Sequence, residues 1–510
     1  MFQLKKAAVL ALAGCMALTL MAGCGGGEGT ESGAASAEAG KYGTINDGKP
    51  VTISLDLNNY LPSINEKPTA QSPIVFRSIQ YIADEFMTYF PNVTIEWDRT
   101  KMSVGNWSQW MTTQLASEAA PEVVMLHGAE YADRGWYIRL NEILEEPNIF
   151  VEGNTKWKDM FPEYLWSSSM TTDVLGNIVA VPTVLYPGTA TTYFYNKDIF
   201  KELNLSVPRT WEEFKDICKK IKDSGKGYVA VGPWSLNKTA NVNLWDIQYT
   251  LGPTYALAMK DQWDYDKNGE MSPEELMRAT YEGKFNASTN PATMDLYRQI
   301  KYKYTEILQE GAENTDYEAM WTEGKVAMME DGAWRMNTEE ANTRRKFEYG
   351  VFPVPIATST TSKYAADVTW EKGPYQPPIA ESYNLVKATI ERKGPGAQEA
   401  AVKFLQFLTK KENLDQMILE KHGESIGAVI GTTIPPELEE WFENDFARMP
   451  NCQWVTGPTV SSQTRMSRQL EMWVKGMISD AEFQKNYDAE LKKGVEEQMT
   501  AFGIDASKWK

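Results

Sequence analysis

The stretch from Thr192 to Ile221, TYFYNKDIFKELNLSVPRTWEEFKDICKKI, predicts a strand followed by two helices. Two tyrosines alternate with smaller neighbours at its start, as in a half-buried strand. Asp198 can cap a short helix, and Thr210 with Glu213 forms a Thr-x-x-Glu capping box for the second helix. That helix has one buried stripe, because apolar residues recur at i, i+3, i+4 and i+7: Phe214, Ile217, Cys218 and Ile221. The stretch is therefore typical of an α/β layer.

The first part of the chain has the same alternation of strands and helices. The pattern predicts strands over Val51 to Leu57, Val93 to Trp97 and Pro121 to Leu126, separated by helices over Ser72 to Phe90 and Asn106 to Glu118. This order predicts an α/β fold with parallel neighbouring strands. With 510 residues, the chain is long enough for two or three domains.

The N-terminus has the features of a targeting segment that is not part of the fold. Two lysines precede an apolar run, Ala7 to Ala22, and the sequence Met-Ala-Gly-Cys ending at Cys24 resembles a lipobox. We predict a signal peptide over residues 1–23, lipidation of Cys24 and a flexible Gly/Ala/Ser-rich tether over residues 24–47. Cys15 closes a competing lipobox, but its apolar run is shorter and no linker follows it. The protein is thus expected outside the cytoplasm, held to the membrane by lipid, and the long tether favours a Gram-positive cell surface.

The composition excludes several classes of function. The net charge of −18 disfavours nucleic acid and anionic lipid as partners, because the field of the protein repels polyanions. The chain has two histidines, His127 and His422, which argues against His-rich metal sites and most His-dependent catalysis. Cys218 lies on the buried stripe of its helix, which favours an inert thiol over a disulfide with Cys452, although pairing stays an alternative.

A metal-binding motif lies between Asp264 and Glu275. The sequence DYDKNGEMSPEE fits the calcium loop D-x-[DN]-x-[DN]-G-x5-E at every defined position, and Gly269 permits its tight turn. Calcium prefers several hard oxygen ligands, which would come from Asp264, Asp266, Asn268, the carbonyl of Glu270, Ser272 and a bidentate Glu275. The alternative is an acidic surface loop before a helix capped at Ser272. Because the preceding helix is weak, we expect a structural calcium site and not a sensor.

Several further blocks identify a family resemblance. They are Tyr-Asn-Lys-Asp-x-Phe from Tyr195, Thr-Trp-Glu-Glu-Phe from Thr210, Pro-Glu-Val-Val from Pro121, the segment EAMWTEGKVAMMEDGAW ending at Trp334, and AAVKFLQFL from Ala400. Together these blocks resemble the family 1 extracellular solute-binding proteins of sugar ABC importers, in that family's order along the chain. The resemblance departs from the usual pattern where Glu122 replaces an aspartate.

The resemblance implies a type II periplasmic-binding-protein-like α/β fold of two lobes. Each lobe would be a mostly parallel sheet flanked by helices, and the hinge would consist of two or more crossing segments. The first lobe would hold residues 48–187 and about 356–425, and the second residues 188–355 and about 426–510. The implied function is a monomeric, lipid-anchored protein that captures an oligosaccharide and delivers it to ABC permease transmembrane subunits. Alginate-binding members of the family carry a similar calcium loop.

The resemblance also implies a ligand site. Sugars present apolar C–H faces and a rim of hydroxyls, so a site needs flat rings and planar polar side chains. Trp334, in the Gly-x-Trp ending, and Trp234 would come from the second lobe. Stacking on the sugar is favoured over core packing for Trp334, and the two roles are equally open for Trp234. Packing, capping or a surface role is an open alternative for the other positions carried over: Asn58, Asn59, His127, Glu130, Tyr186 and Trp454. Leu126, His127 and Glu130 stand where the maltose-binding pattern has a tryptophan and a charged pair, so the sugar is not specified.

The remaining motif, Gly-x-Ser-x-Gly from Gly423 to Gly427, resembles a hydrolase elbow. A helix is predicted ahead of it where a strand is needed, and no histidine follows Ser425 as the triad order requires. We therefore predict no catalytic residues and a binding protein. The alternatives are a surface carbohydrate-active enzyme, for which no paired carboxylates are placed, and an adhesin or sensor lipoprotein.

Overall fold

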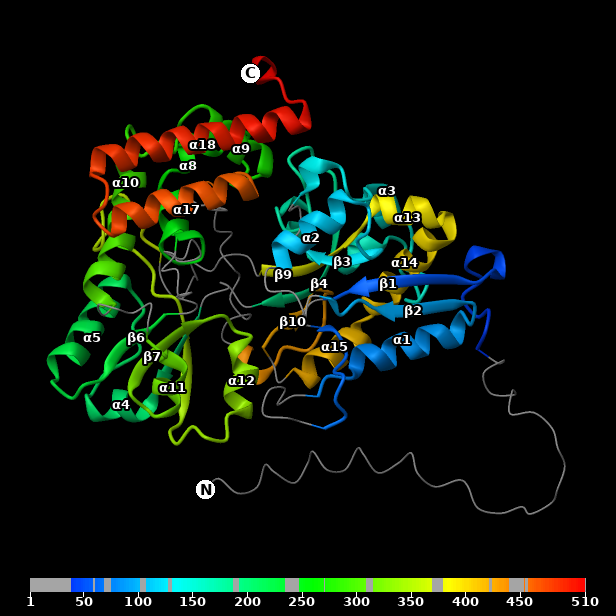
Figure 1. Cartoon of the computed structure of the whole chain (residues 1–510), viewed down its shortest axis with the longest axis horizontal. Helices are drawn as coiled ribbons and strands as arrows, with labels where there is room; N and C mark the ends of the chain where they lie inside the picture. The colour runs from blue at the N-terminus through cyan, green and yellow to red at the C-terminus, as the bar shows by residue number, and fades with distance from the viewer. Residues whose placement is uncertain are drawn as a thin grey trace.

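The computed structural model describes residues 38–57, 60–67, 75–100, 107–126, 131–186, 192–233, 247–269, 271–308, 315–368, 379–421, 424–439, 454 and 457–509. The strands of these residues form two sheets, one of six strands and one of four. Each sheet and the helices packed on it form one lobe, and the two lobes lie side by side (Figure 1). Each lobe has its own large hydrophobic core.

The first lobe is built on the six-stranded sheet, with strand order β10-β4-β9-β3-β1-β2. Strand β1 (Val51–Asp56) is parallel to both β2 (Val93–Trp97) and β3 (Val123–Leu126). The antiparallel part consists of β4 (Ala180–Tyr186), β9 (Ile379–Leu385) and β10 (Ile426–Gly427). The helices of this lobe are α1 (Ser78–Tyr89), α2 (Trp107–Ala116), α3 (Asn141–Glu145), α13 (Lys387–Lys393), α14 (Pro395–Leu408) and α15 (Lys411–Glu420).

The second lobe is built on the four-stranded sheet, with strand order β6-β7-β5-β8. Strand β5 (Thr192–Asn196) is antiparallel to β7 (Val326–Asp331) and to β8 (Tyr349–Pro353), and β6 (Val229–Gly232) is parallel to β7. Its helices are α4 (Lys197–Glu202), α5 (Trp211–Asp223), α7 (Gly252–Ala258), α8 (Lys260–Trp263), α9 (Pro273–Tyr281), α10 (Pro291–Tyr302), α11 (Tyr317–Thr322), α12 (Arg335–Ala341), α17 (Val460–Val474) and α18 (Asp480–Phe502).

The expectation of mostly parallel sheets is wrong, because both sheets are mixed. Among the described strands, three neighbouring pairs are parallel and five are antiparallel. A strand–helix–strand pattern predicts parallel neighbours only where the chain stays within one lobe. Strand β9 enters the first sheet after a passage through the second lobe, and it lies antiparallel to both of its neighbours.

The stretch from Thr192 to Ile221 folds as a strand and two helices. Thr210 caps α5, and the capping box with Glu213 is formed in both directions, as predicted. The short helix α4 is capped by Asn196 and not by Asp198, because the Asn196 side chain accepts hydrogen bonds from the backbone N–H groups of residues 198 and 199. Cys218 is a buried free thiol on the inner face of α5, and Cys452 lies outside the described residues.

The chain passes between the two lobes more than once, as the family resemblance implied. It leaves the first sheet after β4, returns from β8 to β9, and leaves again after β10 to reach α17 and α18, which pack in the second core. Residues Ile426 and Gly427 pair with β4, so this short stretch belongs to the first sheet although we assigned it to the second lobe. The other lobe boundaries stay a prediction.

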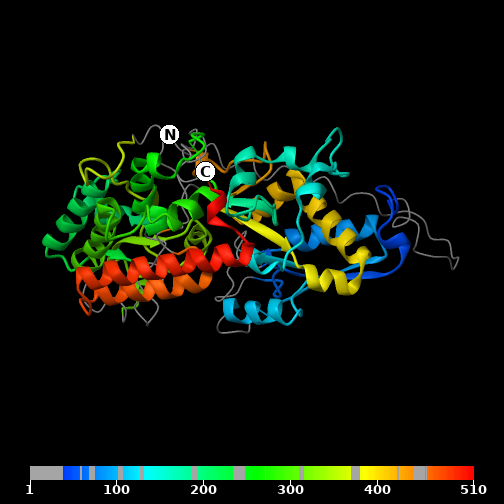
Figure 2. The ribbon, with the colours of Figure 1, turned by 90° about the horizontal axis from the view of Figure 1, so that it is seen from above.

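The C-terminal helices make an apolar contact between the lobes. Figure 2 shows α17 and α18 alongside one another on the second lobe, with the end of α18 reaching the first lobe. There Val174 of the first lobe packs with Met277 of α9 and with Val495 and Met499 of α18. This apolar contact joins the two lobes at a place separate from the polar groups described below.

Candidate ligand-binding site where the lobes meet

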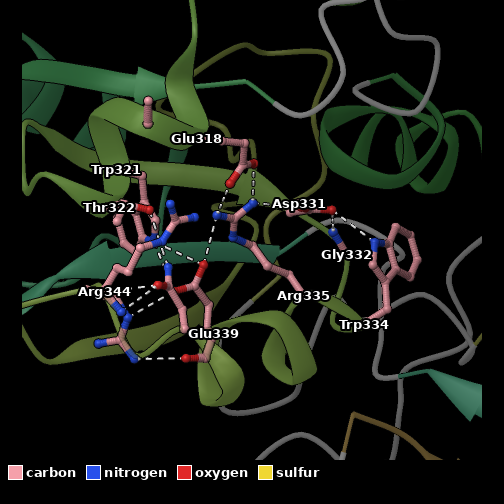
Figure 3. Close-up of polar contacts among 12 residues, drawn as sticks. Glu318, Trp321, Thr322, Asp331, Gly332, Trp334, Arg335, Glu339 and Arg344 are labelled. Carbon is pink, nitrogen blue, oxygen red and sulfur yellow. Dashed lines mark hydrogen bonds and ion pairs between the residues drawn. The ribbon is translucent and has the colours of Figure 1, made fainter. Parts of the chain in front are cut away.

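Trp334 lies between the end of strand β7 and helix α12 (Figure 3). Helix α12 lies on the second lobe's side of the boundary (Figure 1). The Trp334 indole Nε1 donates a hydrogen bond to Asp331 Oδ1 at 3.0 Å. The ring lies against Gly332, where an added Cβ would be 2.2 Å from ring atoms Cη2 and Cζ2. Position 332 therefore requires glycine because the indole occupies the space of a side chain, which explains the Gly-x-Trp spacing.

Asp331 belongs to a network of charges around the buried Arg335, which extends to the exposed Glu318 (Figure 3). The Arg335 guanidinium donates to Asp331 Oδ2 at 3.1 Å and to both carboxylate oxygens of Glu318 at 2.7 and 2.9 Å. It also lies 2.8 Å from Glu339 Oε1. Burial raises the pKa of Asp331 to about 6, and the nearby Arg335 charge opposes this rise. Asp331 is therefore mainly ionised at neutral pH and gains protons in mild acid.

Tyr186, at the end of β4, is a first-lobe residue that contacts Trp334. Its ring meets the Trp334 ring edge to face, with centroids 5.8 Å apart and an interplanar angle of 88°. Its hydroxyl donates to Glu381 Oε1 of β9 at 3.1 Å and lies 3.3 Å from the hydroxyl of Tyr60. An aromatic ring from each lobe is thus in direct contact, and hydrogen bonds hold the first-lobe ring in place.

A second polar contact joins the lobes beside these rings. Asn337 of α12 donates a hydrogen bond from Nδ2 to Glu424, which precedes β10 of the first lobe. Glu424 is buried, and Lys421 Nζ lies 3.6 Å from its Oε1. Burial raises the pKa of Glu424 to about 7, although Lys421, Asn337 and Tyr60 act in the opposite direction. The protonation of Glu424 therefore changes near neutral pH.

These groups form one set that we call the boundary cluster. It contains two rings in edge-to-face contact and several carboxyl, hydroxyl and amide groups, contributed by both lobes: Tyr60, Tyr186, Glu381 and Glu424 from the first, and Trp334 and Asn337 from the second. Rings of this kind can pack on the apolar face of a sugar, and the polar groups can bind its hydroxyls. Trp334 is half-buried and the other five residues are buried, so a ligand can contact the whole set only when the lobes move apart.

The structure describes three of the eight residues predicted for the ligand: Trp334, Tyr186 and Trp454. It brings Trp334 and Tyr186 together. The other five predicted residues lie outside the described part of the chain: Asn58, Asn59, His127, Glu130 and Trp234.

Trp454 lies in a different place from the boundary cluster. Its side chain is 1% exposed and packs in the core of the second lobe. Its ring stacks on Phe285, with centroids 4.3 Å apart and an interplanar angle of 12°. Trp454 packs within one lobe, away from the boundary cluster, so it takes the packing role that the sequence leaves open beside ligand contact.

Sequence reasoning missed the polar residues that surround Trp334 and Tyr186. The buried strand β7 ends in two acidic residues, Glu330 and Asp331, after an apolar run, and a buried carboxylate needs a partner. That signal points to both residues: Glu330 pairs with Lys303, and Asp331 accepts the indole N–H of Trp334. No comparable local signal exists for Glu381 and Glu424, because strands from distant parts of the chain bring them to Tyr186 and Asn337.

The predicted metal loop precedes helix α9 of the second lobe. Carboxylate oxygens of Asp264, Asp266 and Glu275 all lie within 4.8 Å of one another. Gly269 has a positive φ of 87°, as a tight turn requires, and its N–H donates to both carboxylate oxygens of Asp264 at 3.3 and 3.2 Å. Ser272 caps α9 through a capping box with Glu275. Of the remaining predicted ligands, Glu270 lies outside the described residues.

This donor set fits a hard cation, because calcium and magnesium prefer carboxylate oxygens. The loop is also held by protein contacts: Lys260 Nζ lies 3.3 Å from Asp264, and Glu275 accepts a hydrogen bond from the backbone N–H of Tyr265 at 2.8 Å. Glu275 contacts both the loop and the helix start: Oε1 accepts the backbone N–H of Tyr265, and Oε2 accepts the backbone N–H of Ser272 in the capping box. The metal loop and the capped helix, the two alternatives from the sequence, are therefore compatible.

A comparison with protein families identifies the family of the chain. The model of the bacterial extracellular solute-binding protein family matches residues 69–414, more than half of the sequence. The chain belongs to this family. As an extracellular solute-binding protein it is a binding component and not an enzyme, as the sequence predicted. A comparison with curated proteins found no match.

Solved solute-binding proteins have the same fold. A chitin oligosaccharide binding protein has a TM-score of 0.58 and 18% identity, covering 87% of this chain and 99% of its own. The solute-binding protein RafE in complex with raffinose has a TM-score of 0.56 and 17% identity, covering 87% and 100%. An ABC substrate-binding protein from Listeria monocytogenes, in complex with cycloalternan, has a TM-score of 0.56 and 13% identity, covering 90% and 100%. The periplasmic-binding-protein-like fold is thereby confirmed.

The position of this solute-binding protein relative to the membrane rests on the family and on its N-terminus. Family membership makes it an extracellular component of an ABC importer. Within the described part of the chain, no helix has the length and apolar character that crossing a bilayer requires. Both candidate lipidation residues, Cys24 and Cys15, lie outside that part.

Proposed function

We propose that this solute-binding protein captures a neutral oligosaccharide between its lobes and delivers it to the transmembrane subunits of an ABC permease. The observation that carries the proposal is the contact between Trp334 of the second lobe and Tyr186 of the first. A ligand that packs on both rings gains contacts from both lobes. Three proteins of the same fold support a carbohydrate: one is a chitin oligosaccharide binding protein, and the other two are in complex with raffinose and with cycloalternan.

The charges of the site favour a neutral sugar over an acidic one. Glu381 of the boundary cluster is a carboxyl group, Glu424 adds a negative charge when it is ionised, and Asp331 lies directly behind Trp334. The whole chain carries a net charge of −18, which adds to the repulsion of anions. A uronate sugar would meet this repulsion, whereas the hydroxyls of a neutral sugar can donate hydrogen bonds to the carboxylates.

The proposed mechanism is a change in the population of closed molecules. The segments that pass between the lobes allow one lobe to rotate against the other. A ligand bound by both lobes has more contacts in the closed state than in the open state, so it stabilises the closed state by that difference. The closed protein is then the form that the permease subunits recognise. We propose a monomer, because each chain carries both halves of the site.

Thermal unfolding with a panel of glycans tests the proposal. The panel contains raffinose, maltotriose and an N-acetylated chitin trimer as neutral sugars, and a trigalacturonate as the acidic one. A ligand that binds only the native state raises its stability by about 2.7 kcal/mol at one hundred times its dissociation constant. We expect at least one neutral glycan to raise the melting temperature of the parent protein and of the control Trp509→Ala. We expect no rise with Trp334→Ala.

The control Trp509 is also a half-buried tryptophan, but it packs on Tyr281 near the C-terminus and outside the boundary cluster. A panel without any shift, or a shift that Trp334→Ala leaves intact, contradicts the proposed site. A shift with trigalacturonate alone contradicts the neutral ligand.

We also propose that the loop from Asp264 to Glu275 binds a structural calcium ion. The carboxylates of Asp264, Asp266 and Glu275 would hold it, together with the further oxygens of Asn268, Glu270 and Ser272. The ion supplies positive charge that offsets the repulsion among three carboxylates. We expect calcium to raise the melting temperature of the parent protein relative to a chelator.

Glu275→Gln is the matched variant for the calcium proposal. Glutamine can still close a capping box with Ser272, but it lacks the charge and the bidentate carboxylate that calcium prefers. We expect the variant to fold and to lose the response to calcium. An equal response in the parent protein and the variant, or none in either, contradicts the calcium site.

Finally, we propose that Cys24 carries the lipid and that residues 24–47 tether the protein to the outer face of a Gram-positive membrane. A palmitate label in producing cells is expected on the parent protein and on Cys15→Ala. Cys24→Ala should lack the label and appear in the medium. Labelling of Cys24→Ala would assign the lipid to another residue.

A further inference from the structure

The indole N–H of Trp334 is already used by the protein. Nε1 donates to Asp331 Oδ1 at 3.0 Å, and the same oxygen accepts the backbone N–H of Gly332 at 2.7 Å. Asp331 lies at the end of β7, opposite Thr192 of β5 in the ladder. The acceptor is therefore part of the sheet and not of a loop, so it can hold the ring in a fixed orientation.

Other charges hold the Asp331 carboxylate itself. Its second oxygen accepts from Arg335, whose side chain is 4% exposed and is also bound by Glu318 of α11 and Glu339 of α12. Glu339 in turn accepts the indole N–H of the buried Trp321, with 3.0 Å to each of its oxygens. The network connects β7, α11 and α12, and Figure 3 shows it on the side of Asp331 away from Trp334. A binding group held by such a network loses little freedom when a ligand binds.

We infer that Asp331 is a positioning residue for ligand binding: its carboxylate takes the indole N–H of Trp334 and fixes the orientation of the ring. Trp334 then offers a sugar its π surface, and its N–H is not available to a sugar hydroxyl. The consequence for the ligand rests on the proposed function, whereas the fixed orientation of the ring does not.

The arrangement responds to pH. Protonation of Asp331 removes the negative charge that the indole N–H and Arg335 both contact, and burial already raises its pKa to about 6. The charged groups that face it are Arg335 and, through Arg335, Glu318 and Glu339, while β5 presents the uncharged Thr192. The hydrogen bond from the Trp334 indole to Asp331 should therefore weaken as the pH falls through about 6.

The test is the indole resonance of Trp334 in the ligand-free protein labelled with ¹⁵N-indole tryptophan. The resonance is assigned as the one that Trp334→Phe lacks. In the parent protein we expect it to titrate with a midpoint near pH 6. Asp331→Ala should shift it at all pH values and speed its exchange with water about tenfold, as expected for one lost hydrogen bond to a charged group.

Asp331→Asn is the conservative variant, because its amide oxygen can still accept from the indole but cannot titrate. We expect it to keep slow exchange and to lose the midpoint near pH 6. A Trp334 resonance that is the same in Asp331→Ala, or a midpoint that persists in Asp331→Asn, overturns the inference. If Asp331→Ala does not fold, the titration of Asp331→Asn decides alone. Failure of every glycan to bind would contradict the proposed function and leave this result standing.

Discussion

Trp334 and Trp454 were both expected to contact the ligand, and the structure places them in opposite environments. Trp334 is half-buried at the boundary between the lobes, with its N–H on Asp331 and its ring edge to face with Tyr186. Trp454 is fully buried and stacks on Phe285 within one lobe. The aromatic residue type alone therefore does not predict where a tryptophan lies. The neighbours of Trp334 distinguish it: a glycine that makes room for the ring and a carboxylate that accepts its N–H.

The largest expected effect is a difference in the free energy of unfolding between alanine variants of the two tryptophans. Trp454→Ala leaves a cavity in the second core and should lower the free energy of unfolding by about 3–5 kcal/mol. Trp334→Ala removes a half-buried ring and one hydrogen bond, for which we expect about 1–2 kcal/mol. Urea unfolding of both variants measures the difference. Equal losses would contradict the assignment of Trp454 to the core and Trp334 to the boundary.

The second effect concerns pH, to which the boundary cluster should respond and the core around Trp454 should not. The pKa of Glu424 is about 7 in the folded protein and close to 4.5 when unfolded, so the folded state binds the extra proton between these values. The free energy of unfolding should therefore fall by up to about 3 kcal/mol as the pH rises from about 4.5 through 7. Glu424→Gln should lose this part of the pH dependence.

Trp454→Phe is the control for the pH measurement, because it changes the core and leaves the carboxyl groups in place. It should unfold more easily at every pH and keep the slope of the parent protein. Identical slopes for the parent protein and Glu424→Gln would show that Glu424 does not titrate in this range.

The smallest effect concerns the glycine that makes room for Trp334. In Gly332→Ala the new methyl group would overlap the indole, so we expect the ring to move and stability to fall by about 1–3 kcal/mol. Gly503→Ala is a control at the end of α18, where the glycine has a positive φ of 66° but no atom within 4 Å of the added Cβ. It should leave the Trp334 indole resonance unchanged. An unchanged resonance in Gly332→Ala would contradict the packing of the ring on this glycine.

Much of the fold followed from local patterns in the sequence. The capping box at Thr210, the buried stripe of α5 and the strand before Trp334 all depend on residues close together in the chain. The direction of β9 did not follow, because it is set by a passage through the other lobe. Local patterns indicate periodicity and helix caps. They contain no information about which strands pair when a long segment of the other lobe separates them in the sequence.

The same reason limits what the sequence could say about the site. Trp334 and Tyr186 were found because their positions match family motifs. Glu424 and Asn337 come from segments 87 residues apart, and their contact depends on how the two lobes meet. Trp454 was carried over from the family resemblance with packing left open, and its core partner, Phe285, is too distant in the sequence for a local pattern to decide between the two.

Calorimetric titration of Trp334→Ala tests the central claim most directly, with the neutral glycan that gives the largest thermal shift in the parent protein. The account predicts that the parent protein and Trp509→Ala bind it with the same affinity. Trp334→Ala should bind it at least about tenfold more weakly, since stacking on one aromatic ring contributes on the order of 1.4 kcal/mol. Equal affinity of all three proteins would contradict a ligand site at the boundary of the lobes.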